Sequence, residues 1–242
     1  MKAMILAAGL GTRLRPWTLQ HPKALVPVGG IPMLHRVITS LTAQGFDDIT
    51  VNIHHFGQQI IDFLNSKEYG TRINISDERG HLLDTGGGIV HASKFLCADA
   101  EPFLVHNVDI LSDADLCGLM KAHIENKADA TLLLSDRNSS RKLAMNENNR
   151  LVGWHNCTTE EHRPASYIPH SSDKEFAFSG IHCISPALAD RMSRKYGGRP
   201  FPIMDFYLEE CADSDIRCEV CSFSMIDIGK PETLTRANSI FI

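Results

Sequence analysis

Residues 2–16 read Lys2-Ala3-Met4-Ile5-Leu6-Ala7-Ala8-Gly9-Leu10-Gly11-Thr12-Arg13-Leu14-Arg15-Pro16. The apolar residues at the start predict a buried strand over 2–7. Glycines directly after such a strand let the backbone come close to a ligand, and successive free N–H groups there can surround phosphate oxygens. We therefore expect Ala8, Gly9, Gly11 and Thr12 to bind phosphate, with Arg13 adding fixed positive charge. The turn lacks the third glycine of a dinucleotide-binding motif and the Gly-Lys-Ser/Thr of a P-loop, so by itself a plain tight turn explains it equally well.

Apolar runs bounded by turn residues alternate with amphipathic stretches along the rest of the chain. Further strands are predicted at 48–53, 72–76, 103–107 and 130–134, with helices between them where apolar residues recur three and four apart, as at Leu34, Val37, Ile38 and Leu41. Alternation of this kind is typical of strand-helix-strand units. The expected fold class is α/β, a Rossmann-like mixed and mainly parallel sheet flanked by helices.

A chain of 242 residues with 43% hydrophobic content is long enough to bury one substantial core, and we expect a single domain over 1–242. The sequence becomes polar over about 138–175, which predicts a hairpin excursion with a long loop. Regular patterning resumes at Phe176–Ile184, and the chain closes with a strand region at 218–228 and a last helix from Glu232.

The bulk composition excludes several classes of function. The formal net charge of −5 offers no basic surplus for a nucleic acid, so a small-molecule ligand is expected. The apolar start is too short for a signal peptide, and no apolar stretch is long enough to cross a bilayer. Seven scattered cysteines favour a reducing compartment, so we expect a cytoplasmic protein; Cys218 and Cys221 are interpreted as two ordinary thiols in one strand.

A second basic segment follows the glycine turn. Pro22-Lys23-Ala24-Leu25-Val26-Pro27-Val28 holds its lysine between two prolines, and we expect an extended segment that projects Lys23 into a site. Together with Leu6-Ala7-Ala8-Gly9-x-Gly11-Thr12-Arg13-Leu14-x-Pro16-x-Thr18, it resembles the signature of sugar-1-phosphate nucleotidyltransferases. In detail the chain is most similar to N-acetylmuramate 1-phosphate uridylyltransferases and to mannose-1-phosphate guanylyltransferase-like proteins.

The resemblance assigns a nucleotide pocket to a second glycine-rich segment. Asp84-Thr85-Gly86-Gly87-Gly88-Ile89 precedes a helical run, where backbone amides can face a base or ribose. The family's nucleotide contacts then fall on Thr85, Gly86 and Gly87, with Glu78 upstream facing the base. Without the family, a glycine-rich helix entry would be at least as good an interpretation.

Two aspartates are predicted to bind one Mg²⁺. Asp109 follows the strand at 103–107, at the carboxyl edge where open parallel sheets bind ligands, and Mg²⁺ takes one or two protein carboxylates beside phosphate oxygens. Asp227 lies in Met225-Ile226-Asp227-Ile228-Gly229-Lys230-Pro231, which resembles the family's late Asp-x-Gly-x-Pro turn. Relatives commonly carry glycine where this chain has Val108. Most of the sequence separates the two aspartates, so only the fold can bring them together.

The sugar contacts are assigned by resemblance to Ala177-Phe178-Ser179-Gly180-Ile181, in particular to Ser179 and Gly180, with Asn107 added as a sugar or phosphate contact. For Ser179, a strand residue beside a bulge is an equally good interpretation. The family's Glu-Lys-Pro segment is replaced by Gly153-Trp154-His155-Asn156. The twelve histidines lack a helical metal-ligand spacing such as H-E-x-x-H, and we assign them no chemistry.

These residues predict an enzyme that joins a nucleoside triphosphate and a sugar 1-phosphate, releasing pyrophosphate. Arg13 and Lys23 are the expected catalytic residues, and Mg²⁺ is the expected cofactor. The family resemblance alone makes UTP and N-acetylmuramate 1-phosphate the preferred substrates, which suggests a role in peptidoglycan recycling. The alternatives are a mannose-1-phosphate guanylyltransferase, a glycosyltransferase, and a non-catalytic nucleotide-sugar sensor with the same fold. No trimerising hexapeptide extension follows the last helix, and a monomer or homodimer is expected.

Overall fold

The strand predicted at the start of the chain lies in the middle of the sheet. In the computed structural model, which describes residues 1–240, β1 (Lys2–Leu6) pairs in parallel with β4 (Asp48–Ile53) on one side and with β6 (Phe103–Asn107) on the other. Its side chains are buried on both faces, as expected for a strand covered by helices on each side. The apolar residues 3–6 therefore lie in a strand with both faces toward the core, and this strand ends one residue before the predicted bound at Ala7.

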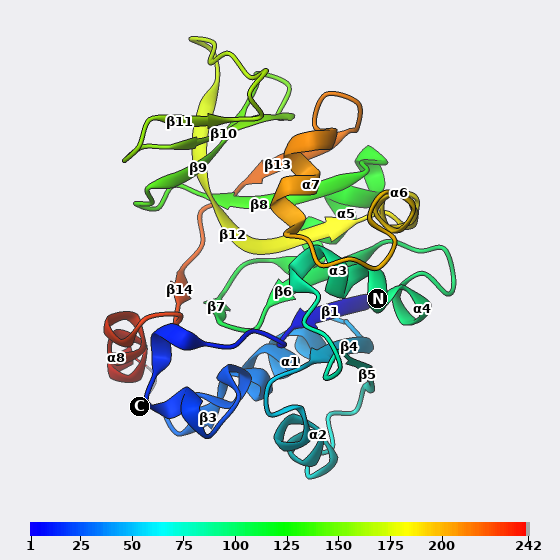
Figure 1. Cartoon of the computed structure of the whole chain (residues 1–242), viewed down its shortest axis with the longest axis vertical. Helices are drawn as coiled ribbons and strands as arrows, with labels where there is room; N and C mark the ends of the chain where they lie inside the picture. Colours follow the sequence, from blue (N-terminus) through cyan, green and yellow to red (C-terminus); the bar gives the residue numbers. More distant parts are fainter. Residues whose placement is uncertain (241–242) are drawn as a thin grey trace.

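The remaining elements alternate along the chain (Figure 1). The other strands are β2 (Pro27–Val28), β3 (Ile31–Pro32), β5 (Arg72–Asp77), β7 (Ile110–Ser112), β8 (Ala130–Ser135), β9 (Arg141–Met145), β10 (Leu151–Asn156), β11 (Glu161–Arg163), β12 (Lys174–Ile184), β13 (Ile216–Val220) and β14 (Met225–Asp227). The helices are α1 (Met33–Ala43), α2 (Gly57–Asn65), α3 (Asp84–His91), α4 (Ser93–Leu96), α5 (Leu116–Asn126), α6 (Pro186–Tyr196), α7 (Ile203–Glu210) and α8 (Pro231–Ile240). Single 3-10 turns occur at Thr12–Leu14, Trp17–Leu19 and Lys23–Leu25.

The main sheet is mixed and runs β11-β10-β9-β12-β6-β1-β4-β5, with β8 paired to β12 and β13 to β8. Strands β6, β1, β4 and β5 are parallel, whereas β12 is antiparallel to β6, β8 and β9. The long strand β12 carries the sheet from its parallel half into the excursion, and its register shifts between Phe178 and His182. Gly180 lies in this irregularity with φ of 77°, a conformation that glycine adopts without strain.

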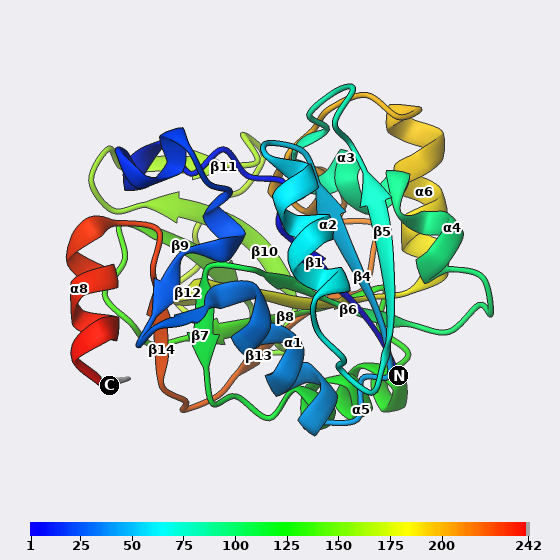
Figure 2. The ribbon, with the colours of Figure 1, turned by 90° about the horizontal axis from the view of Figure 1, so that it is seen from below.

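Two apolar clusters form the core, one on each face of the sheet. In Figure 2, helices α1 and α2 lie on the near side of the strands. Because successive strand residues point to opposite faces, Ala3 and Ile5 join the cluster beneath α1, α2 and α5, and Met4 joins the cluster beneath α3, α6 and α7. The side chains predicted for the first helix, Leu34, Val37, Ile38 and Leu41, are all buried in the first cluster. Replacing Leu34 or Leu41 by alanine is expected to lower the free energy of unfolding by about 2–5 kcal/mol.

Local signals mark the ends of α6. The side chain of Ser185 accepts the Leu188 N–H, Pro186 occupies the first turn, and the helix stops at Gly197, which adopts φ of 57°. These three residues satisfy or replace the backbone groups that a helix leaves unpaired at its ends. The helix therefore places its apolar face, including Leu188 and Met192, against the sheet.

The predicted fold class is confirmed, and the predicted strands at 48–53 and 103–107 have the predicted bounds. The predicted extended form of 22–28 is wrong around Lys23, which begins a 3-10 turn. Helix α3 begins at Asp84 itself, so the three glycines lie inside the helix and not before it. The predicted strand region at 218–228 is two strands: β13 ends at Val220 in the main sheet, and β14 pairs with β7.

The polar excursion adds three strands to the sheet. β9, β10 and β11 form an antiparallel series that joins β12, and they make up the upper end of the molecule in Figure 1. Residues 241–242 of the predicted domain lie outside the described residues. Over residues 1–240, none of the helices combines the length and the apolar character that crossing a membrane requires.

Candidate functional site

The glycine turn is anchored beneath by a buried asparagine. Asn52, inside β4, accepts the N–H groups of Ala7 and Ala8 at 2.6 and 3.3 Å. Gly11 has φ of 62°, and a Cβ there would stand 2.9 Å from the Cβ of Lys23. The missing side chain therefore gives the stem of Lys23 room to pass under the turn.

The two predicted metal-binding aspartates are neighbours in space. Asp109 follows β6, and its carbonyl oxygen accepts the N–H of Ile228 at 2.9 Å. In the β7–β14 ladder Asp227 stands opposite Ile110, the residue that follows Asp109. Lys23 forms an ion pair with Asp109, and the two side chains are only 13% and 15% exposed.

Gly229 marks the point where the charged groups converge. An ideal Cβ on this residue would lie 2.8 Å from Arg13 Nη2, 2.8 Å from Asp227 Oδ1 and 3.3 Å from Asp109 Oδ2. Segments from the start, middle and end of the chain thus place two carboxylates and two cations within a few ångströms of one another. Such a group can hold a hard cation and neutralise phosphate charge.

A cavity of about 320 Å³ opens beside this charged cluster. It lies at the carboxyl edge of the parallel strands, where ligands bind in open α/β sheets. Its lining comprises Leu6, Ala8, Gly9, Lys23, Asn52, Leu82, Asp84, Thr85, Asn107, Val108 and Asp109. The predicted residues Ala8, Gly9, Lys23, Thr85, Asn107 and Asp109 therefore share one cavity.

Glu78 lies behind the cavity and supports Asn52. Its Oε1 accepts a hydrogen bond from Asn52 Nδ2 at 2.8 Å, and its side chain is almost fully buried. Burial raises the pKa of this carboxyl group, against the opposing effect of the Asn52 hydrogen bond. Oε2 is buried without a hydrogen-bond partner among the described residues. Glu78 lines a separate hollow with His81 and His91.

Gly86 and Gly87 make room for a neighbouring loop. Both donate their N–H groups to the carbonyl of Phe201, at 2.9 and 3.4 Å, and a Cβ on Gly86 would stand 2.1 Å from the Phe201 ring. Thr85 lines the cavity, but its hydroxyl accepts the N–H of Ile203 at 2.9 Å. The helix start therefore presents Asp84 and Thr85 to the cavity and uses its glycines for packing.

The predicted sugar contacts separate into two groups. Asn107 lines the cavity and lies against Gly180, where a Cβ would stand 2.6 Å from the Asn107 amide nitrogen. Ser179 is 1% exposed, and its hydroxyl donates to the Leu133 carbonyl at 2.7 Å inside the sheet. Its hydroxyl is thus held within the sheet by the bulge of β12.

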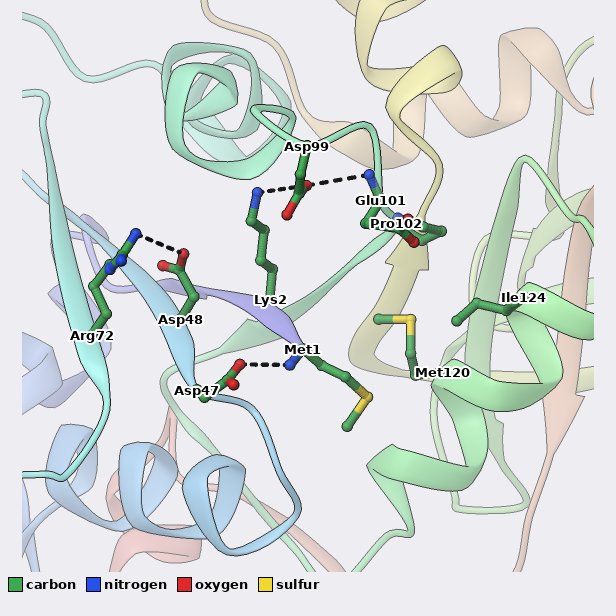
Figure 3. Close-up of a pocket in the computed structure, with 10 residues that line it drawn as sticks. All are labelled: Met1, Lys2, Asp47, Asp48, Arg72, Asp99, Glu101, Pro102, Met120 and Ile124. Atoms are coloured by element: carbon green, nitrogen blue, oxygen red, sulfur yellow. Dashed lines mark hydrogen bonds and ion pairs between the residues drawn. The ribbon is translucent and has the colours of Figure 1, made fainter.

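A second hollow lies at the opposite, amino edge of the strands, lined by ten residues that include Lys2, Asp48 and Arg72 (Figure 3). Two of its cations are paired within the wall: Lys2 with Asp99 at 2.7 Å, and the terminal amine of Met1 with Asp47 at 2.6 Å. Its lining includes neither the glycine turn nor Lys23, Asp109 or Asp227, so we place the candidate site at the carboxyl edge.

The family model described as "Nucleotidyl transferase" matches residues 2–143, which include the glycine turn, Lys23 and Asp109. The chain belongs to the nucleotidyl transferase family. A mannose-1-phosphate guanyltransferase of Yarrowia lipolytica is 28% identical over 248 aligned positions, covering 100% of this chain and 64% of that protein. An N-acetylmuramate alpha-1-phosphate uridylyltransferase of Caulobacter vibrioides is 44% identical over 110 positions, covering 44% of this chain and 45% of that protein.

Solved nucleotidyltransferases share the fold. A putative glucose-1-phosphate thymidylyltransferase from Bacillus anthracis superposes with a TM-score of 0.81 at 21% identity, covering 100% of this chain and 95% of that one. At 21% identity this structural match supports the nucleotidyltransferase fold alone.

The chain spans less than two thirds of the length of the first curated relatives that it matches.

Two residues of this candidate site were not singled out from the sequence. Asn52 is a polar residue among the apolar ones of a predicted strand, and that was the available signal, because buried amides need hydrogen-bond partners. In the structure it is 2% exposed. Gly229 was visible only as part of the Asp-x-Gly-x-Pro turn, and its closeness to Arg13 and Asp109 depends on the fold.

Proposed function

We propose that the protein transfers a nucleotidyl group from a nucleoside triphosphate to a sugar 1-phosphate and releases pyrophosphate. The observation that carries this proposal is the convergence of Arg13, Lys23, Asp109 and Asp227 around Gly229, beside a cavity at the carboxyl edge of the sheet. The sugar-phosphate oxygen attacks the α-phosphorus of the triphosphate, and pyrophosphate leaves.

The proposed chemistry needs little from the protein beyond positioning and charge. A phosphate monoester with a second pKa of about 6 is already largely dianionic at neutral pH, so it needs no general base. The guanidinium of Arg13 and the ammonium of Lys23 offset negative charge on the phosphates. The triphosphate is bound by the glycine turn, which comprises Ala8, Gly9, Gly11 and Thr12. The sugar phosphate is positioned by Asn107 together with Gly180.

Asp109 and Asp227 are the residues that would hold a divalent metal ion, proposed to be Mg²⁺. Their carboxylates are hard oxygen ligands from adjacent turns, and Lys23 already compensates the charge of Asp109. When bound, such an ion supplies neutralisation of phosphate charge. We further propose that Glu78, Thr85, Gly86 and Gly87 shape the nucleotide end of the site, Gly86 and Gly87 through the loop they pack against. Ser179 is proposed to act at the sugar end of the site only indirectly, by fixing the position of the neighbouring Gly180.

UTP and N-acetylmuramate 1-phosphate are the preferred substrates, which would give the enzyme a role in peptidoglycan recycling. The 44% identity to the Caulobacter vibrioides uridylyltransferase over 110 positions supports this pair. GTP and mannose 1-phosphate form the second candidate pair, supported by the alignment of the whole chain with the Yarrowia lipolytica guanyltransferase. We infer a cytoplasmic monomer or homodimer, and the seven free cysteines agree with a reducing compartment.

A substrate matrix tests the proposal. Four nucleoside triphosphates are mixed with N-acetylmuramate, mannose and glucose 1-phosphates and Mg²⁺, and pyrophosphate release is measured. Release that requires one triphosphate, one sugar phosphate and the metal is the expected result. Asp109→Ala and Asp227→Ala should each abolish release while the melting temperature stays near that of the wild type. Full activity in either variant would end the metal assignment, and nucleotide-sugar binding without any release would favour the sensor.

A further inference from the structure

The excursion carries a cluster of metal-ligating side chains that the proposed reaction does not use. His155 on β10, His162 on β11 and Glu175 on β12 each offer one ligand atom, and these atoms lie within 4.8 Å of one another. The three side chains come from three strands and are all half-buried. Two imidazoles and a carboxylate form a mixed nitrogen and oxygen ligand set, unlike the two carboxylates of the nucleotidyltransferase site.

Strand pairing holds the cluster together. His155 and His162 stand directly opposite each other in the β10–β11 ladder, with ring centroids 4.3 Å apart and ring planes 5° from parallel. Glu175 reaches the same point, with Oε1 and Oε2 at 3.0 and 3.1 Å from His155 Nδ1. The next residues along β10 and β12, Trp154 and Phe176, pack into the core on the other face. Alternation therefore keeps the three ligands together on the outer face of the sheet.

Further groups around the cluster are suited to complete a coordination shell. Glu160 Oε2 lies 3.4 Å from His155 Nε2, and Cys157 Sγ lies 3.8 Å from His155 Nδ1. Both side chains belong to exposed residues of the turn between β10 and β11. Lys142 lies opposite His155 in the β9–β10 ladder, and the two carboxylates of Glu160 and Glu175 outweigh its single charge.

The simplest alternative is a hydrogen-bonded surface cluster without a metal. That interpretation accounts for the His155–Glu175 pair. It leaves the ring of His162 stacked on that of His155, and within residues 1–240 the one hydrogen bond of the His162 ring is to the Glu160 carbonyl, at 3.1 Å. We propose that His155, His162 and Glu175 bind one Zn²⁺, with Glu160, Cys157 or water as the fourth ligand. Ligand atoms of a tetrahedral zinc site lie about 3.3 Å apart, so modest side-chain rotations close the cluster. The ion would pin the three-residue edge strand β11 to β10 and β12.

The chemistry of the ligands selects the metal. Imidazole nitrogen with one carboxylate suits Zn²⁺, whereas Mg²⁺ prefers an all-oxygen shell. The cluster and the proposed nucleotidyltransferase site should therefore be loaded by different ions, and each can be tested while the other is occupied.

The test is calorimetric titration of the untagged full chain with Zn²⁺ alone, in buffer containing millimolar Mg²⁺ to occupy Asp109 and Asp227. One equivalent of Zn²⁺ is expected to bind and to raise the melting temperature. Loss of even an outer-shell partner of a metal ligand costs about 10–100-fold in affinity, so His155→Ala and His162→Ala should each weaken binding by at least that factor. Co²⁺ should give the visible absorption of a tetrahedral site in the wild type and not in the His155→Ala and His162→Ala variants.

Two further variants keep the result interpretable. His170→Ala is the matched control, because this exposed histidine lies in the same excursion and bonds Ser172 at 2.8 Å, outside the cluster. It should bind Zn²⁺ like the wild type. Glu175→Gln keeps the shape of the side chain and should still weaken binding if a histidine variant fails to fold. The proposal is overturned if the wild type shows no saturable binding, if the His155 and His162 variants bind normally, or if only Cys157→Ser loses the ion.

Discussion

At the scale of single residues, one glycine determines whether the charged groups can meet. Gly229 has Arg13, Asp227 and Asp109 within van der Waals range of where a side chain would begin. Its N–H also donates to Asp227 Oδ1 at 2.7 Å, which orients that carboxylate. The smallest residue is therefore required here by the atoms around it, and a methyl group would compete with the proposed metal and phosphates for the same space.

Gly229→Ala is expected to lower kcat for pyrophosphate release with little effect on folding. Displacing reacting groups by about 1 Å costs roughly 100-fold in rate, and the added methyl would stand 2.8 Å from Arg13 Nη2 and Asp227 Oδ1. Steady-state kinetics with a melting curve is the measurement. Gly80→Ala, at a position with no atom within 4 Å of the new Cβ, is the control. Wild-type kcat in Gly229→Ala would contradict the site.

Glu78→Gln is expected to stabilise the protein near pH 8. Burial raises the Glu78 pKa above its ordinary value of 4.5, so the folded state loses stability as pH rises from that value through the raised pKa. Glutamine does not ionise, and its Oε1 can still accept from Asn52. The melting temperature of the variant should therefore exceed that of the wild type by an amount that grows from pH 5 to pH 8. A difference that shrinks over this range would show that folding does not disfavour the ionised form of Glu78.

At the scale of elements, the start of α3 depends on a close approach by the loop before α7. Phe201 stacks on Tyr196 with centroids 3.8 Å apart and receives the N–H of Gly86 on its carbonyl. The Phe201 N–H in turn donates to Leu83 at 3.2 Å. Two glycines in the first turn of a helix weaken it intrinsically, but here they allow this backbone contact.

Gly86→Ala is expected to destabilise the fold, because its methyl would stand 2.1 Å from the Phe201 ring. Overpacking of this kind typically costs about 1–3 kcal/mol, and for a chain of this size each kcal/mol lowers the melting temperature by about 2–4 °C. Thermal denaturation followed by circular dichroism measures it, with Gly80→Ala as the reference. An unchanged melting temperature would mean that the loop moves freely away from α3.

At the scale of the whole molecule, the sheet is built around buried histidines as well as apolar side chains. His182 on β12 is fully buried against Tyr207, with Nδ1 2.6 Å from the hydroxyl, and burial lowers its pKa to about 3. His123 on α5 contacts Thr131 at 2.9 Å, and burial lowers its pKa to about 4. Both rings are neutral in the folded protein at physiological pH.

Folding stability is expected to fall as pH drops below about 6.5. Above that pH these histidines are neutral in both the folded and the unfolded state. Below it they become protonated in the unfolded chain, whereas in the folded chain they stay neutral down to about pH 3–4. Each such proton changes the free energy of unfolding by about 1.4 kcal/mol per pH unit. Denaturant titrations at pH 7 and pH 5 measure the slope, and His123→Gln should reduce it. A slope that is the same in this variant would remove His123 from the account.

Much of the architecture follows from local patterns. The strand at 48–53, the helix carrying Leu34 to Leu41 and the edge position of Asp109 were predictable, because side-chain periodicity and turn residues act over a few neighbouring positions. The one-turn helix at Lys23 was not, since flanking prolines allow an extended path and a tight turn alike. The role of the helical glycines at 86 and 87 was also hidden, because their partner Phe201 lies more than a hundred residues away.

The sequence by itself determined the α/β class, the family and the residue types available for phosphate and metal binding, because these depend on short-range order and composition. Only the tertiary structure decided that Arg13, Lys23, Asp109 and Asp227 share one point, that Ser179 turns into the sheet, and that two histidines and a glutamate meet on the excursion. Contacts between distant segments depend on how strands are ordered and registered across the sheet, and local sequence patterns do not encode that order.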